Sequence, residues 1–178
     1  LGHTATGTDS PITVTGLTNG VTYTFTVTAT NANGTSSSSP TSNSVTPATT
    51  PGTPTSVSAV RGNGEATVTF TAPVSNGGSA ITSYTVTSSG GQTATGGSSP
   101  ITITGLTNGT AYTFTVTATN AIGTGSASAS SNTVTPVTVP DAPIIGTATR
   151  GNGEVVVTFT PPVNDGGLTI TNYTVTSS

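Results

Sequence analysis

The chain contains no cysteine, methionine, tryptophan or lysine, and it has few charged residues of either sign. Without cysteine it forms no disulfide bond and offers no thiol for catalysis or metal binding. Its formal net charge of −3 comes from five acidic residues and two arginines. No basic patch is therefore available to bind nucleic acid or an anionic membrane surface by counterion release. No apolar run approaches the roughly 18 residues that cross a bilayer, so we expect no membrane insertion in this segment.

The side chains that enzymes use are almost missing as well. The one histidine is His3, and neither lysine nor a second histidine is available to activate the many serine and threonine hydroxyls. Asp165 is a single carboxylate in its loop, whereas Ca²⁺ takes about 6 to 8 oxygen ligands. A turn-forming role accounts for it better. We predict a protein that is not an enzyme and that holds neither a metal nor a cofactor.

Serine, threonine and glycine dominate what remains, a composition that disordered chains share. The order of the residues indicates a folded chain, because valine, isoleucine, tyrosine and phenylalanine alternate with threonine. Residues 101–120, ITITGLTNGTAYTFTVTATN, show this pattern on both sides of GLTNG, a stretch rich in turn formers. A period of two with threonine on the wet face predicts β-strands that are buried on one side.

The sequence repeats with an offset of 89 residues, the distance from Ser10 to Ser99. Residues 10–34 recur almost unchanged as residues 99–123, and residues 61–70 recur as residues 150–159. The last residues followed by the first would read TVTSSLGHTATG, which matches TVTSSGGQTATG inside the chain. We therefore expect the two ends to continue the same series.

Gly105, Leu106, Asn108, Gly109 and Tyr112, followed by F-T-V-T-A-T-N-A-x-G, resemble the corner between strands E and F of a fibronectin type III domain. The resemblance covers the whole chain. It implies an all-β fold of tandem fibronectin type III or immunoglobulin-like β-sandwiches with an 89-residue repeat, as in bacterial extracellular or cell-surface repeat proteins.

On this resemblance, residues 1–50 form the C-terminal half of a module, with strands E, F and G. Residues 51–139 form a complete module, and residues 140–178 form the N-terminal half of a further one, with strands A, B and C. The joints between them, PATTPGTP and PVTVPDAP, are rich in proline, which favours short, stiff connections. The strands expected in the complete module are residues 56–60, 66–71, 81–87, a short edge strand near 92–95, two strands within 101–120, and 132–135.

Eight side chains are expected to hold the modules together. Tyr112 and its repeat equivalent Tyr23 would pack their rings in the core while their hydroxyls bond the preceding corner. Phe70 stands where the resemblance implies a core tryptophan. The complete set is Tyr23, Tyr112, Leu17, Leu106, Tyr84, Tyr173, Phe70 and Phe159.

The sequence predicts an array of modules that serves as an extracellular or cell-surface spacer, stalk or filament. Its partners are other copies or neighbouring modules, which complete the half modules at the ends. A carbohydrate-binding or adhesive module attached to a secreted enzyme or adhesin is the alternative, with cell-surface or matrix polysaccharide as the partner. Exposed aromatic side chains would favour that alternative, yet all eight phenylalanine and tyrosine residues fall at core positions of the pattern. The sequence does not decide between a covalently continuous array and one assembled between chains.

Overall fold

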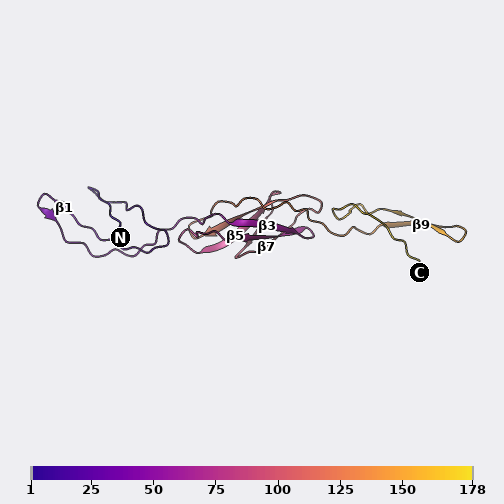
Figure 1. Cartoon of the computed structure of the whole chain (residues 1–178), viewed down its shortest axis with the longest axis horizontal. Helices are drawn as coiled ribbons and strands as arrows, with labels where there is room; N and C mark the ends of the chain where they lie inside the picture. Colours follow the sequence, from indigo (N-terminus) through magenta and orange to yellow (C-terminus); the bar gives the residue numbers. More distant parts are fainter. Residues whose placement is uncertain (1, 178) are drawn as a thin grey trace.

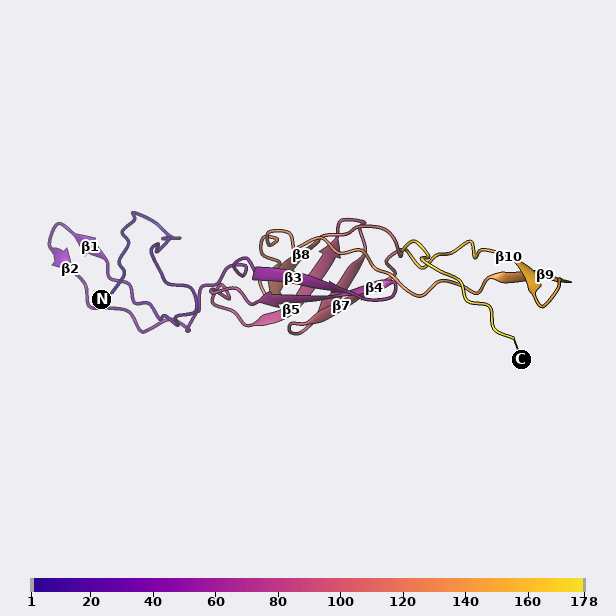
Figure 2. The ribbon, with the colours of Figure 1, turned by 45° about the vertical axis from the view of Figure 1, so that its right-hand side comes forward.

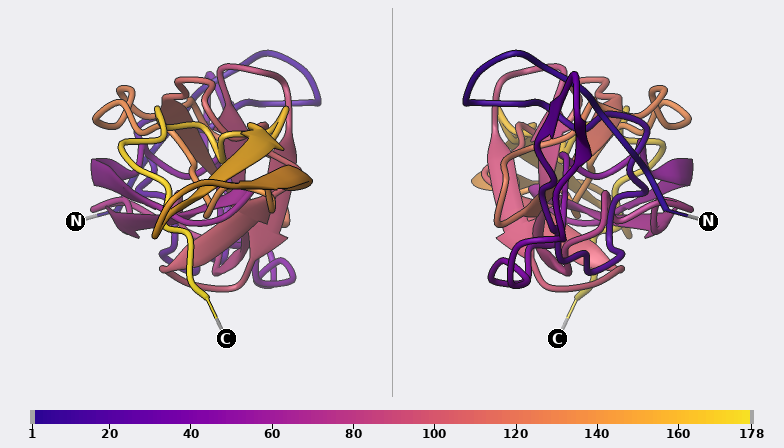
Figure 3. Two further views of the ribbon diagram at one scale, coloured as in Figure 1. Left: turned by 90° about the vertical axis from the view of Figure 1, so that its right-hand side faces the viewer. Right: turned by 90° about the vertical axis from the view of Figure 1, so that its left-hand side faces the viewer.

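The computed structural model describes residues 2–177, and it shows an elongated molecule with three parts in a row (Figure 1). Residues 2–50 lie at one end, a sandwich of strands lies in the middle, and residues 140–177 lie at the other end. Viewed along the long axis, the flanking parts project onto the central sandwich, so the three parts follow one line (Figure 3). The described residues form strands and loops but no helix, so this part of the chain has no helix that could cross a membrane.

The central module consists of two antiparallel sheets of three strands each (Figure 2). The first sheet has the order β3-β4-β7, with β3 at Thr55–Arg61, β4 at Glu65–Thr71 and β7 at Ile101–Thr104. The second sheet has the order β6-β5-β8, with β6 at Thr93–Gly96, β5 at Ile81–Ser88 and β8 at Phe114–Asn120. This arrangement confirms the predicted all-β sandwich.

The core between these sheets contains the apolar half of each alternating strand. Val68 of β4 and Ile103 of β7 face Val86 of β5 and Phe114 of β8, and all four side chains are fully buried. Threonine occupies the opposite face, where its β-branched side chain suits a pleated and partly wet surface. The period of two in the sequence therefore decides which face of each sheet is covered.

The flanking parts contain few regular strands. In residues 2–50 these are β1, Thr30–Asn31, and β2, Gly34–Thr35, and in residues 140–177 they are β9, Ile144–Arg150, and β10, Val155–Thr160. Residues 12–15 and 170–177 are the repeat equivalents of β7 and β5, and they form no strand. The reason is that β7 pairs with β4 and β5 pairs with β8 in the central module, and neither flanking part contains the equivalent partner.

The last strand expected in the central module, residues 132–135, is not a regular strand. Residues 125–134, which we call the serine segment, run beside β8 with three residues for every two of that strand. The backbone N–H of Ser128 donates to the Val116 carbonyl at 2.9 Å, and the N–H of Ser131 donates to the Phe114 carbonyl at 2.9 Å. Only at Val134, opposite Tyr112, do two backbones exchange hydrogen bonds directly.

Serine hydroxyls replace the missing backbone acceptors of this segment. The N–H of Val116 donates to Ser128 Oγ at 2.9 Å, and the N–H of Phe114 donates to Ser131 Oγ at 3.1 Å. In a regular strand, a backbone carbonyl would accept from these two N–H groups. Here a serine hydroxyl accepts instead, and the segment keeps a spacing of three residues, as an extended polyproline-type chain does. Ser39 and Ser42 make the same contacts with Val27 and Phe25 in the first flanking part.

Candidate functional site

Tyr112 and Tyr23 make the corner that their sequence context predicts. The backbone N–H of Thr107 donates to the Tyr112 hydroxyl oxygen at 3.1 Å, and the N–H of Thr18 donates to the Tyr23 hydroxyl oxygen at 3.0 Å. The hydrogen bond from the Thr107 backbone lowers the pKa of Tyr112, because a donor stabilises the ionised phenolate. These tyrosines tie the start of one strand to the turn before it.

The remaining side chains of the predicted set fall into two groups. In the central module Leu106, Phe70 and Tyr84 are buried, and the rings of Phe70 and Tyr84 lie 4.8 Å apart. In the last flanking part the equivalent rings of Phe159 and Tyr173 lie 4.7 Å apart at nearly the same angle. Tyr173 is nevertheless 40% exposed, against 7% for Tyr84. Leu17 and Phe159 are half-buried.

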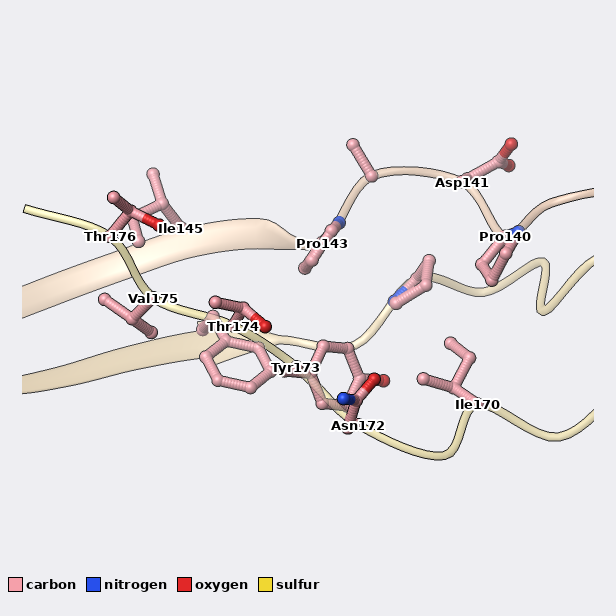
Figure 4. A pocket seen from close by; sticks show the side chains of 13 residues that line it. Pro140, Asp141, Pro143, Ile145, Ile170, Asn172, Tyr173, Thr174, Val175 and Thr176 are labelled. Atoms are coloured by element: carbon pink, nitrogen blue, oxygen red, sulfur yellow. The ribbon is translucent and has the colours of Figure 1, made fainter.

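The uncovered Phe159 and Tyr173 rings contribute to an open groove of about 560 Å³ in residues 140–177. Figure 4 shows Ile145, Ile170 and Tyr173 among the side chains that line it. Asp141 is the one titratable acid of this lining. The groove is therefore an open and mostly apolar surface, and its described lining places no two acid or base side chains where they could transfer a proton together.

Two titratable residues that the sequence singles out are accounted for locally. The His3 ring packs edge-on against the Tyr23 ring, with 5.8 Å between their centroids. Asp165 Oδ1 accepts a hydrogen bond from the Gly167 N–H at 2.9 Å, as Asn76 Oδ1 does from the Gly78 N–H. Asp165 is thus a turn residue, and residues 2–177 contain no cluster of three or more metal-ligating side chains.

Asn120, which the sequence analysis did not single out, makes contacts that reach beyond its own strand. Its amide nitrogen donates to the carbonyl of Thr49, in the linker before the central module, at 2.8 Å. It also donates to the carbonyl of Asn76 at 2.9 Å, and its oxygen accepts from the N–H of Ile122 at 2.9 Å. The signal was its place at the end of an otherwise alternating strand, at the equivalent of Asn31 one repeat earlier. Asn120 is buried, so its amide connects the linker at Thr49 to the loop at Asn76 without contact with solvent.

The central module matches a known domain family. The model described as fibronectin type III domain matches residues 50–134. A search of curated proteins gave no match to the chain. Among solved structures, domains d3–d4 of the rat CD45 extracellular region share 17% identity with a TM-score of 0.54, covering 76% of this chain and 74% of that one. At this identity the similarity shows the fold alone.

Two multidomain structures give lower structural scores. The structure of three titin domains is 26% identical with a TM-score of 0.49, covering 63% of this chain and 40% of that one. The chicken CNTN1 FN1–FN3 structure is 20% identical with a TM-score of 0.45, covering 65% of this chain and 44% of that one. The chain spans less than half the length of each of these two structures.

Proposed function

We propose that this chain, with the fibronectin type III domain of residues 50–134 as its complete unit, is part of a structural array. In that array 89-residue sandwiches follow one another as a spacer, stalk or filament outside the cell or at its surface. The chain is not an enzyme on this proposal, since residues 2–177 place no cluster of three or more histidine, aspartate and glutamate side chains together and Asp165 serves a turn. Each module would be completed by a neighbouring segment of the array or by another copy of the chain.

One pair of valines carries the proposal. Val86 of β5 and Val116 of β8 are direct partners across the central sheet, and both are 0% exposed. Their repeat equivalents, Val175 in the last flanking part and Val27 in the first, are 59% and 63% exposed. Each flanking part therefore exposes an apolar face that is buried in the central module, where both halves of a sandwich are present. Burying such faces stabilises by about 25 cal/mol per Å² of apolar surface, which drives the two kinds of half together.

A lengthened chain tests whether the array is modular. A copy of residues 1–50 placed after residue 178 should close the last flanking part into a second complete sandwich. We expect the Val175 amide to become as protected from hydrogen exchange as the Val86 amide, and the heat absorbed on unfolding to rise about twofold, since this heat scales with folded length. The same extension carrying Val27→Asp in the added copy is the control, and it should leave Val175 unprotected. An unprotected Val175 in the lengthened chain without that substitution would contradict the proposal.

Location and length test the spacer role itself. Antibody raised against the central module should label intact cells of the source organism, and electron micrographs of chains with more periods should show particles whose length grows in proportion. Labelling that requires permeabilised cells would contradict a role outside the cell.

The second candidate, a carbohydrate-binding or adhesive module, draws on one surface of the central sheet. Thr85 pairs with Thr95 on one side and Thr117 on the other, and the next register along pairs Thr87 with Thr93 and Thr115. This gives two rows of three threonines, and neighbours within a row lie on adjacent strands about 4.8 Å apart. Such rows of hydroxyls could contact a polysaccharide surface. Twist of the sheet works against a long flat lattice, so the spacer role is preferred. Binding on a glycan array that is lost in Thr85→Val would favour the second candidate.

A further inference from the structure

Two glycine-containing loops meet at the joint between the first flanking part and the central module. Gly20 ends the GLTNG corner, and Gly78 ends the SNGG loop between β4 and β5. A Cβ atom on Gly78 would overlap the backbone nitrogen of Gly20, and a Cβ atom on Gly77 would overlap the carbonyl oxygen of Thr49. Gly77 is buried there, so the approach of the two backbones leaves no space for a side chain at either position.

The linker that crosses this joint is hydrogen-bonded to the same loop. The N–H of Thr49 donates to the Gly77 carbonyl at 2.8 Å, and the N–H of Gly52 donates to the Ser75 carbonyl at 2.9 Å. Asn120 then holds the Thr49 carbonyl from the end of β8. The linker is therefore held at Thr49 and Gly52 by the SNGG loop of the central module. Gly20 of the first flanking part packs directly on that loop.

The second joint repeats this geometry with different linker residues. The N–H of Thr138 donates to the Gly166 carbonyl at 2.8 Å, and the N–H of Asp141 donates to the Asn164 carbonyl at 3.1 Å. A Cβ atom on Gly167 would lie 2.5 Å from the backbone nitrogen of Gly109. Because the two linkers differ in sequence while their backbone contacts agree, the joint is determined by the loops and not by linker side chains.

We infer that each module carries two complementary docking surfaces, its GLTNG corner at one pole and its NGG or DGG loop at the other. The partner of each surface is the next module of the same kind. Separate domains move relative to one another unless their interface prevents it. The backbone contacts at this interface set one orientation for every joint, so the array is a stiff rod. This inference rests on the proposed function for its biological use, and it deepens that proposal by naming what makes a spacer rigid.

The full 178-residue chain provides the test. Since it has no cysteine, two spin labels can be placed through Ser44→Cys and Thr95→Cys, exposed positions on opposite sides of the first joint. Double electron–electron resonance spectroscopy should give one narrow distribution of distances between the labels. Gly78→Ala should broaden it at least twofold and remove the hydrogen-exchange protection of the Thr49 and Gly52 amides.

Gly91→Ala is the matched control. Gly91 has a φ of +89° and Gly78 a φ of +85°, so alanine is strained by a similar amount at both positions. No atom lies within 4 Å of a Cβ on Gly91, however, so only Gly78→Ala should change the distribution. Gly20→Ala is a second variant that leaves the sequence of the central module unchanged. Its Cβ would lie 3.1 Å from the Gly78 Cα, so it should broaden the distribution as well.

Protection of the Val68 and Val116 amides reports in each variant that the central sandwich remains folded. A broad distribution in the parent chain would overturn the inference. So would distributions in Gly78→Ala and Gly20→Ala that are as narrow as that of the parent chain. Protection of the Tyr23 and Val45 amides, which exchange backbone hydrogen bonds, reports that the labelled end of the first flanking part is folded, so the outcomes concern the joint. Failure of the lengthened chain to close a second sandwich would instead count against the array, so the two proposals fail separately.

Discussion

The side-chain amide of Asn132 exchanges two hydrogen bonds with the backbone of Ala59. The Ala59 N–H donates to Asn132 Oδ1 at 2.9 Å, and Asn132 Nδ2 donates to the Ala59 carbonyl at 3.0 Å. Ala59 belongs to β3, at the open edge of the first sheet, and Asn132 belongs to the serine segment beside the second sheet. One amide side chain thus takes the place of a neighbouring strand and connects the two sheets at their edge.

Asn132→Asp should destabilise the central module. The carboxylate can still accept from the Ala59 N–H, but it has no donor for the Ala59 carbonyl and places a negative charge beside it. We expect the free energy of unfolding in urea, followed by circular dichroism, to fall by about 1–3 kcal/mol. Asn43→Asp is the control, because the equivalent amide there bonds only the neighbouring Ser44 carbonyl, at 3.4 Å. An equal effect of both substitutions would show that the bridge to Ala59 is not the cause.

Tyr112→Phe removes the acceptor of the Thr107 N–H while it keeps the aromatic ring. A backbone donor near the corner then loses its partner, so the thermal midpoint should fall by about 4 °C or more. Tyr173→Phe removes a hydroxyl from a half-exposed ring with no equivalent corner in residues 140–177, and its midpoint should match that of the parent chain. Calorimetry measures both, and an unchanged midpoint for Tyr112→Phe would contradict the structural role of this hydroxyl.

Ser131→Ala tests the unusual spacing of the serine segment. The substitution leaves the buried N–H of Phe114 without its acceptor, which should cost about 1–3 kcal/mol of unfolding free energy. Ser130 is exposed, and Ser130→Ala should stay within about 0.5 kcal/mol of the parent. If both variants unfold alike in urea, the hydroxyl of Ser131 does not replace a backbone acceptor.

Asp165→Asn should have no measurable effect on stability or on the response to chelators. The amide oxygen can accept from the Gly167 N–H as Asn76 does from Gly78 in the central module. Calorimetric scans with and without EDTA should therefore coincide for the parent and for the variant. A midpoint that falls on adding EDTA, in the parent only, would indicate a bound cation at this turn.

Six of the seven strands expected in the complete module are present, and residues 132–135 are the exception. The structure places β3, β4 and β5 within one residue of the expected ranges, shifts the short edge strand β6 by one residue, and forms β7 and β8 inside residues 101–120. Alternation is a local property, and it decides a strand when a partner is present to pair with it. The same patterns in residues 12–15 and 170–177 give no strand because that partner is missing there.

The remaining features depend on contacts that no local pattern contains. The three-residue spacing of the serine segment is not visible in its sequence, where serine stands at 126, 128, 130 and 131. The spacing follows only when the hydroxyls of Ser128 and Ser131 are counted as acceptors for β8. The Asn132 bridge and the Asn120 contacts join residues more than 40 positions apart. The glycines of the NGG loops are predictable as turn residues, whereas their close approach to the preceding module is a property of the assembled joint.

The serine segment also bears on how neighbouring copies of the chain would interact at close range. A regular edge strand offers donors and acceptors at a spacing that another strand can match, which lets sheets of different molecules merge. The serine segment advances by three residues for every two of β8. The spacing of its backbone donors and acceptors therefore does not match that of an incoming regular strand. If the chain forms the proposed array, its neighbouring copies can pack closely without merging their sheets.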